Sequence, residues 1–198
     1  MSGKFEKYLK DYLILIDTCS MCHEFYPHFM REYEELMVKN GTKIRLTESN
    51  NKELQEHLEE GRHLDKYKDK PKEMEEKRAL AQKASTAINT LFRYPNILRV
   101  LGAKEAPLFA DAGIYTYISA AHVSHNVLLI TQDGKLTYDV MQLRKLLSID
   151  SYYKLECLYF SPRENDFFSK YSDKELKEIK EKAEKEKAEA QKNKKKKH

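Results

Sequence analysis

The sequence predicts an α/β protein, a three-layer α/β/α sandwich whose central sheet has five mostly parallel strands. Two long apolar runs, residues 12–16 and 127–130, are typical of buried parallel strands, and each is followed within three residues by an aspartate. Strand-like and helix-like patterns alternate five times along the chain, which favours a parallel sheet covered on both faces. With 198 residues and 40% hydrophobic side chains, the chain can bury one core of this kind.

The first half of the chain supplies two strands and two helices. After the strand at residues 12–16, apolar side chains recur at helical spacing over residues 25–39, and Asn40-Gly41 ends that helix. Residues 43–47 form a second short strand. Asn50 then caps a further helix over residues 50–58, which would place Glu53 in its first turn.

The second half repeats the alternation. Residues 61–76 are almost wholly charged and include Pro71, which indicates an exposed insert and not core. The patterns that follow predict helices over residues 80–91, 108–121 and 140–147 and strands over residues 97–101, 126–131 and 155–160.

Two regions differ in charge. Residues 1–168 are predicted to be one domain, whereas residues 169–198 form a charged helix that ends in a lysine-rich tail. This tail region holds 12 Lys against 7 acidic residues, while the rest of the chain is nearly neutral. No run of about 18 apolar residues and no apolar signal core is present, and the three cysteines are expected to be reduced thiols. We therefore expect a soluble, cytoplasmic protein without a membrane partner.

Four acidic residues lie at strand ends or in the opening turns of helices: Asp17, Glu53, Asp111 and Asp133. In a parallel sheet these positions share one edge, where open α/β proteins bind their ligands. Converging carboxylates repel each other, and a hard cation such as Mg²⁺ or Mn²⁺ relieves that repulsion. Any single Asp is more often a helix cap or a solvated charge, so the prediction of a metal site depends on the set of four.

The sequence here resembles the PIN domain family of metal-dependent nucleases. The likeness rests on four local patterns in their family order, and it spans roughly residues 13–160. The patterns are Leu-Ile-Asp17-Thr-Cys-Ser, Asn-Lys-Glu53-Leu, Asp111-Ala-Gly-Ile and Val-Leu-Leu-Ile-Thr-Gln-Asp133.

The resemblance implies a Mg²⁺- or Mn²⁺-dependent endoribonuclease that hydrolyses RNA with a water nucleophile. Asp17, Asp111 and Asp133 would be the principal metal ligands, and Glu53 would bind directly or through water. Thr18, Ser20 and Thr131 would be hydrogen-bonding residues behind the ligands. Cys19 departs from the family, which often has Asn there, and residues 61–76 and the C-terminal helix exceed its compact core.

RNA is the implied partner, and several lysines are candidates to contact its phosphates: Lys66, Lys68, Lys194, Lys195, Lys196 and Lys197. A toxin with a cognate antitoxin, a defence effector and an RNA-processing enzyme all fit the resemblance. Another regulatory protein or a second copy of the chain also remains open as a partner.

Two other interpretations remain open. A PIN-like fold can be catalytically inactive and act as a scaffold that binds RNA or protein. Cys19-Ser20-Met21-Cys22-His23 is a C-x-x-C-H motif, which occurs at c-type haem attachment sites, and C-x-x-C after a strand occurs in redox proteins. Haem attachment requires export, and a redox dithiol would have a thiol pKa lowered by a helix N-terminus.

Overall fold

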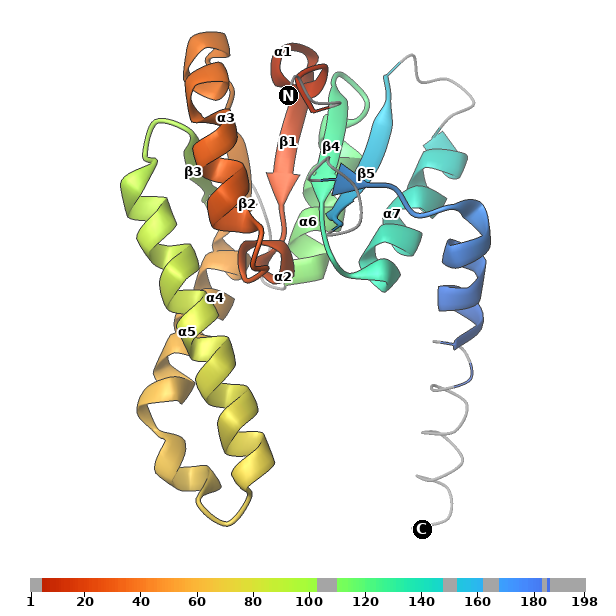
Figure 1. The fold of residues 1–198 in the computed structure, drawn as a ribbon. Coiled ribbons are helices and arrows are strands. Elements are labelled where there is room, and N and C mark those ends of the chain that lie inside the picture. The colour runs from red at the N-terminus through yellow and green to blue at the C-terminus, as the bar shows by residue number, and fades with distance from the viewer. Residues whose placement is uncertain (1–4, 103–109, 148–152, 162–167, 183–184, 186–198) are drawn as a thin grey trace.

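A computed structural model of the chain describes residues 5–102, 110–147, 153–161, 168–182 and 185. The described strands form one mixed sheet in the order β3-β2-β1-β4-β5-β6, in which only the β5–β6 pair is antiparallel (Figure 1). The strands are β1 (Tyr12–Ile16), β2 (Ile44–Thr47), β3 (Leu98–Leu101), β4 (Asn126–Ile130), β5 (Leu155–Phe160) and β6 (Phe168–Ser169).

The predicted α/β class and the mostly parallel sheet are confirmed, but the predicted number of five strands is wrong. The sixth strand, β6, is two residues long and pairs Phe168 with Phe160 and Ser169 with Tyr159. Two residues are too few to show an alternating pattern. The predicted domain boundary after residue 168 falls inside this strand.

Helices connect the strands: α1 (Tyr8–Asp11), α2 (Thr18–Met21), α3 (Tyr26–Asn40), α4 (Glu48–Arg62), α5 (Pro71–Arg93), α6 (Ala110–Ala121) and α7 (Gly134–Leu147). A 3₁₀ turn, η1 (Leu64–Tyr67), joins α4 to α5, and residues 173–182 are helical. Helix α3 ends at Gly41, whose φ of 63° is left-handed and suits glycine. The sequence analysis did not anticipate α1 and α2, which are four residues each.

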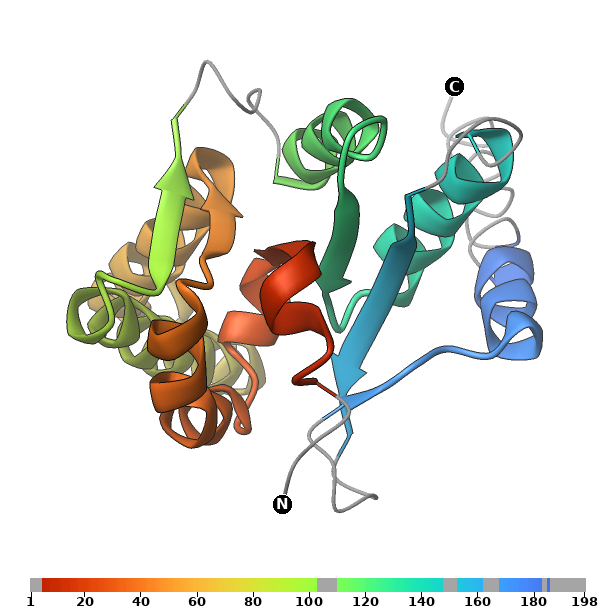
Figure 2. The same ribbon diagram turned by 90° about the horizontal axis from the view of Figure 1, so that it is seen from above.

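Alternate side chains of the strands enter two separate cores, one on each face of the sheet. Ile14 and Ile16 of β1 pack with the aromatic side chains of α3, whereas Leu15 packs with residues of α6 and α7. Figure 2 shows α3 and α6 on opposite sides of β1. Because both faces are covered, the arrangement is compatible with a three-layer sandwich.

Helices α4 and α5 form a hairpin, called here the arm, that extends beyond the sheet at the carboxyl end of β1 (Figure 1). Residues 61–76 form its outer part, and most of them are exposed. Pro71, which the sequence analysis read as an interruption, is the first residue of α5, where its missing N–H is harmless. At Gly61 the two helices touch so closely that a Cβ atom would lie 2.3 Å from Ala81 Cβ.

The helix of residues 173–182 lies beside α7, on the side of the sheet away from α4 and α5 (Figures 1 and 2). Its Leu176 is buried, and a Cβ at Gly134 would lie 2.6 Å from Ile179 Cδ1, so it contacts the start of α7 directly. Among the described residues, no helix combines the length and the apolar character that a membrane crossing requires.

Candidate metal centre

The candidate site lies at the carboxyl ends of β1 and β4, which are neighbours at the centre of the sheet. From β1 the chain proceeds to β2 on one side, and from β4 it proceeds to β5 on the other. Such a change of direction opens a crevice at the sheet edge, which is the usual ligand site of open α/β sheets. Asp17 directly follows β1, and Asp133 follows β4 by three residues.

Asp17 is held by four hydrogen-bond donors. Its Oδ1 accepts from Thr18 N at 2.7 Å and from Asn50 Nδ2 at 3.1 Å, and its Oδ2 accepts from Cys19 Sγ at 2.7 Å and Thr131 Oγ1 at 3.0 Å. The side chain caps α2 and is only 5% exposed. Burial raises the pKa of Asp17, the hydrogen bonds oppose that rise, and the charge of Asp111 adds to it.

Asn50, which the sequence analysis took for the cap of α4, is a buried partner of Asp17. The cap is Thr47, whose Oγ1 accepts from Asn50 N at 3.1 Å, and the helix begins at Glu48. The Asn50 amide instead points away from solvent and donates to Asp17 and to Thr18 Oγ1. The capping-box spacing Thr47-x-x-Asn50 was a signal that could have located the true helix start.

Because α4 starts two residues earlier than predicted, Glu53 lies in its second turn and not in its first. Glu53 is partly buried, and its Oε1 lies 3.9 Å from His57 Nε2. Its charge nevertheless reaches the other acids, since it contributes to the raised pKa of Asp111. Glu53 therefore lies close enough to Asp111 for its charge to affect the pKa of that residue.

Asp133 has a structural task as well as a place at the sheet edge. Its Oδ1 accepts from Lys135 N at 2.7 Å and Leu136 N at 3.1 Å, so it caps the start of α7. Its own N–H donates to Thr131 Oγ1 at 3.0 Å, the hydroxyl that also binds Asp17. Asp133 Oδ2 makes no hydrogen bond with another described residue.

Asp111 is exposed in the first turn of α6 and connects the acids electrostatically. Partial burial raises the pKa of Asp111, and the negative charges of Asp133 and Glu53 raise it further. Since Asp111 also raises the pKa of Asp17, all four predicted acids share one negative field. The positive charge of Lys135 partly offsets this field at Asp111, and the charge of Asp139 adds to it.

The acids share this field without touching. Among the described residues, no three side chains of His, Cys, Asp and Glu lie close enough together to hold one metal ion. The donor chemistry suits Mg²⁺ or Mn²⁺, since it consists of carboxylate oxygens with room for water. A shared ion would require the side chains of the set to move closer together.

The three predicted supporting residues differ in their contacts. Thr131 and Thr18 bond to Asp17 or to its partner Asn50. Ser20 is completely buried, and its Oγ has no hydrogen-bond partner within the described part of the chain.

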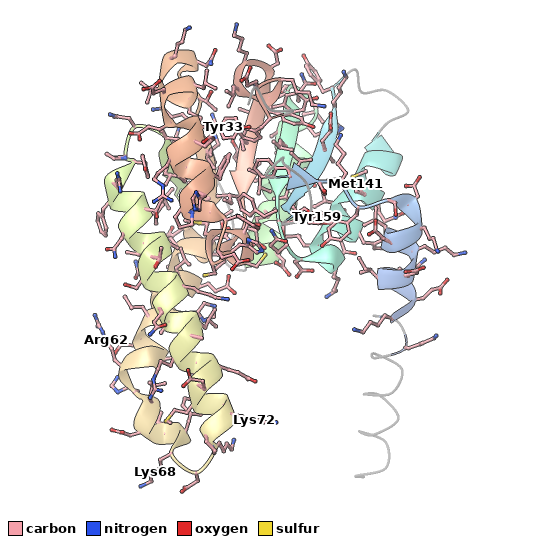
Figure 3. The ribbon with its side chains drawn as sticks, viewed as in Figure 1. Tyr33, Arg62, Lys68, Lys72, Met141 and Tyr159 are labelled. Carbon is pink, nitrogen blue, oxygen red and sulfur yellow. The ribbon has the colours of Figure 1, made fainter. Side chains whose placement is uncertain are left out.

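The predicted lysines lie away from the acids or outside the described residues. Lys66 and Lys68 belong to the outer end of the arm, and Figure 3 shows Lys68 and Lys72 there. Other arm cations pair with acids, including Lys77 with Glu60 at 2.6 Å. Residues 194–197 lie outside the described residues.

The C-x-x-C-H motif has protonated thiols. Burial, together with the charge of Asp17, raises the pKa of Cys19, and burial raises the pKa of Cys22 to about 11. The expected lowering of a thiol pKa by the helix N-terminus is therefore outweighed. His23 stacks against Phe25 and Phe160, with ring centroids 5.5 Å away in each case.

In comparisons with protein-family models, with curated proteins and with solved structures, we found no match to this chain. The case for a function therefore depends on the chain's own residues.

Proposed function

We propose that the protein is a PIN-like, Mg²⁺- or Mn²⁺-dependent endoribonuclease built on a three-layer α/β/α sandwich. One observation carries the proposal: Asp17, Glu53, Asp111 and Asp133 come from four distant segments, yet the charge of Asp111 raises the pKa of Asp17, and the charges of Asp133 and Glu53 raise the pKa of Asp111. A cation bound among these acids would relieve their repulsion.

Each residue has a distinct task in this proposal. Asp17 would bind the cation in place of one of its four hydrogen-bond donors, since these occupy both of its oxygens, and Asp133 would present Oδ2 while its Oδ1 holds α7. Asp111 and Glu53 would complete the set from α6 and α4. A bound Mg²⁺ or Mn²⁺ would activate a water nucleophile and stabilise the leaving 3′ oxygen.

A Mn²⁺ titration tests the proposal. Saturating Mn²⁺ should raise the melting temperature, because a ligand that binds only the folded state stabilises it by RT ln(1 + [L]/Kd). The protein should also cleave single-stranded RNA only with the metal. Asp111→Asn should remove both effects, whereas Asp65→Asn on the outer part of the arm, a matched change at an exposed site, should remove neither.

A catalytically inactive scaffold that binds RNA or protein is the second candidate. It is favoured by the structural tasks of two acids, since Asp17 caps α2 and Asp133 caps α7. A chain that shows no Mn²⁺-dependent stabilisation at millimolar concentration, yet binds RNA, would support it. The third candidate, a redox dithiol, is disfavoured by the raised pKa of both motif thiols, since the thiolate is the nucleophile.

A further inference from the structure

Asn50 has a fully buried side chain whose amide is used at both ends. Its Oδ1 accepts from Thr47 Oγ1 at 2.6 Å and from Thr47 N at 3.3 Å. Its Nδ2 donates to Asp17 Oδ1 at 3.1 Å and to Thr18 Oγ1 at 3.0 Å. Because an amide has two N–H donors, both are satisfied, and a flipped amide would lose its contacts with Asp17 Oδ1 and Thr47 N, since a carboxylate cannot donate and a backbone N–H cannot accept.

We propose that Asn50 is a positioning residue of the candidate metal centre and that it acts through Asp17. This proposal rests on the proposed nuclease function. Its amide fixes the carboxylate of Asp17 from the side of α4. Partners of this kind behind metal ligands set the orientation of the ligand, and their loss typically weakens metal binding or activity about 10- to 100-fold.

The same contact sets the distance between two of the proposed ligands. Glu53 follows Asn50 by three residues on α4, so the two side chains lie on the same side of the helix. The Asn50–Asp17 hydrogen bond therefore attaches the helix that carries Glu53 to the strand end that carries Asp17. Capping alone does not require this bond, because Thr47 Oγ1 accepts from the backbone N–H of Asn50.

The test compares Asn50→Ala with the wild-type chain and with Asn51→Ala, a matched change at the next position of α4. Three quantities are measured: the Kd for Mn²⁺, called here the Mn²⁺ midpoint and fitted to the rise of the melting temperature with Mn²⁺ concentration, and kcat and KM for a single-stranded RNA. For Asn50→Ala we expect a 10- to 100-fold higher Mn²⁺ midpoint, a similar fall in kcat and a nearly unchanged KM. Asn51→Ala should behave as wild type.

A purely structural role predicts a different result, namely a lower melting temperature with the wild-type Mn²⁺ midpoint and kcat. That result for Asn50→Ala would overturn the inference and leave the proposed function intact. If the wild-type chain itself shows no Mn²⁺ response and no cleavage, the proposed function fails, and the inference fails with it.

Thr47→Val provides a second variant in case Asn50→Ala does not fold. It removes the hydroxyl that binds Asn50 Oδ1 but keeps the Asn50 side chain and the branched shape of residue 47. We expect a smaller shift of the Mn²⁺ midpoint in the same direction. A wild-type midpoint in a folded Thr47→Val protein would contradict the role of Asn50 in holding Asp17.

Discussion

At residue scale, the side chain of Asp17 experiences two opposing effects. Burial disfavours its charge, while four donors favour it, and burial is the larger effect because the pKa is raised. The ionised, buried carboxylate of Asp17 therefore lowers the stability of the metal-free protein. A cation that binds to it would offset that cost, which couples metal binding to stability.

Asp17→Asn should therefore abolish cleavage and, without metal, leave the protein at least as stable as wild type at pH 8. The raised pKa of Asp17 means that the folded wild type binds a proton at higher pH than the unfolded chain does. Its stability consequently rises as pH falls through the folded pKa toward 3.8, the ordinary pKa of an Asp side chain, and the variant lacks this gain. Urea unfolding of both proteins in EDTA between pH 4 and 8 measures this difference. A variant that is markedly less stable than wild type at pH 8 would contradict the expectation.

Glu156 illustrates the opposite balance away from the site. Burial opposes its charge, but hydrogen bonds from Lys170, Tyr8 and Tyr12 lower the pKa of Glu156 to about 2. Lys170 directly follows β6, Tyr8 belongs to α1 and Tyr12 is the first residue of β1. Glu156 on β5 therefore connects segments that are distant in the sequence. The Tyr8 hydroxyl donates at 2.8 Å and the Tyr12 hydroxyl at 3.0 Å.

We expect Glu156→Gln to lower the free energy of unfolding at pH 7 by about 1 to 2 kcal/mol, since solvent screens this partly exposed cluster. The lowered pKa makes the contribution of Glu156 fully present above pH 4.5 and lost as pH falls toward 2. The stability difference between the proteins should therefore shrink over that range. Tyr12→Phe, which removes one donor, should have a smaller effect, and a constant difference from pH 7 to 2 would refute this account.

Single residues were also where sequence reasoning was weakest. The positions of Asp17, Asp111 and Asp133 could be predicted because each follows a strong apolar run or opens a helical pattern, whereas Glu53 lies one turn further along its helix than predicted. Asn50 could not, because an Asn before a helical pattern fits a cap as well as a buried partner. The choice depends on whether the side chain meets Asp17, a contact between residues 33 positions apart.

At the scale of elements, β1 to β5 and the helices α3 to α7 were predictable, although α5 and α7 begin nine and six residues before their predicted starts, and the elements α1, α2 and β6 were not predicted. β4 has a nearly continuous apolar sequence and β5 is apolar apart from Glu156, and their positions agree with the prediction to within a residue. α2 has only four residues, and its conformation follows from the Asp17 cap and the packing of Met21 in the core. Tertiary contacts of this kind leave no periodic signal in the sequence.

The arm offers a test of packing between two elements. Gly61→Ala would place a Cβ atom 2.3 Å from Ala81 Cβ, so the helices must separate. We expect a loss of about 1 to 3 kcal/mol in the free energy of unfolding, although alanine is the better helix former. Thermal unfolding of the purified variant measures it.

Combining Gly61→Ala with Ala81→Gly provides the control, because it exchanges the methyl groups across the contact. The double variant should recover a large part of the loss, apart from the cost of the new helical glycine of about 1 kcal/mol. Simple addition of the two single losses would show that the Gly61–Ala81 contact does not determine the spacing of α4 and α5.

At the scale of the whole molecule, charge is distributed unevenly. Several of the arm's cations are paired within the arm, as in Arg62–Glu59 at 2.9 Å and Arg78–Glu75 at 2.8 Å. Lys66 and Lys68 belong to no ion pair between described residues, and they lie at the outer end of the arm. Residues 186–198, by contrast, contain 6 Lys and 2 Glu. This segment is the main source of the chain's net positive charge.

Deleting residues 186–198 should weaken RNA affinity while the melting temperature and the Mn²⁺ midpoint stay at wild-type values. On single strands, log affinity falls with log salt by about 0.7 for each neutralised phosphate, so the truncated protein should show a shallower slope. The cut preserves Leu176 and Ile179, which pack near α7, whereas a cut at residue 173 would remove both and lower the melting temperature. Filter binding of one single-stranded RNA from 50 to 300 mM salt measures both slopes. Equal slopes would assign RNA binding to other cations, with Lys66→Ala and Lys68→Ala on the arm as the next variants to compare.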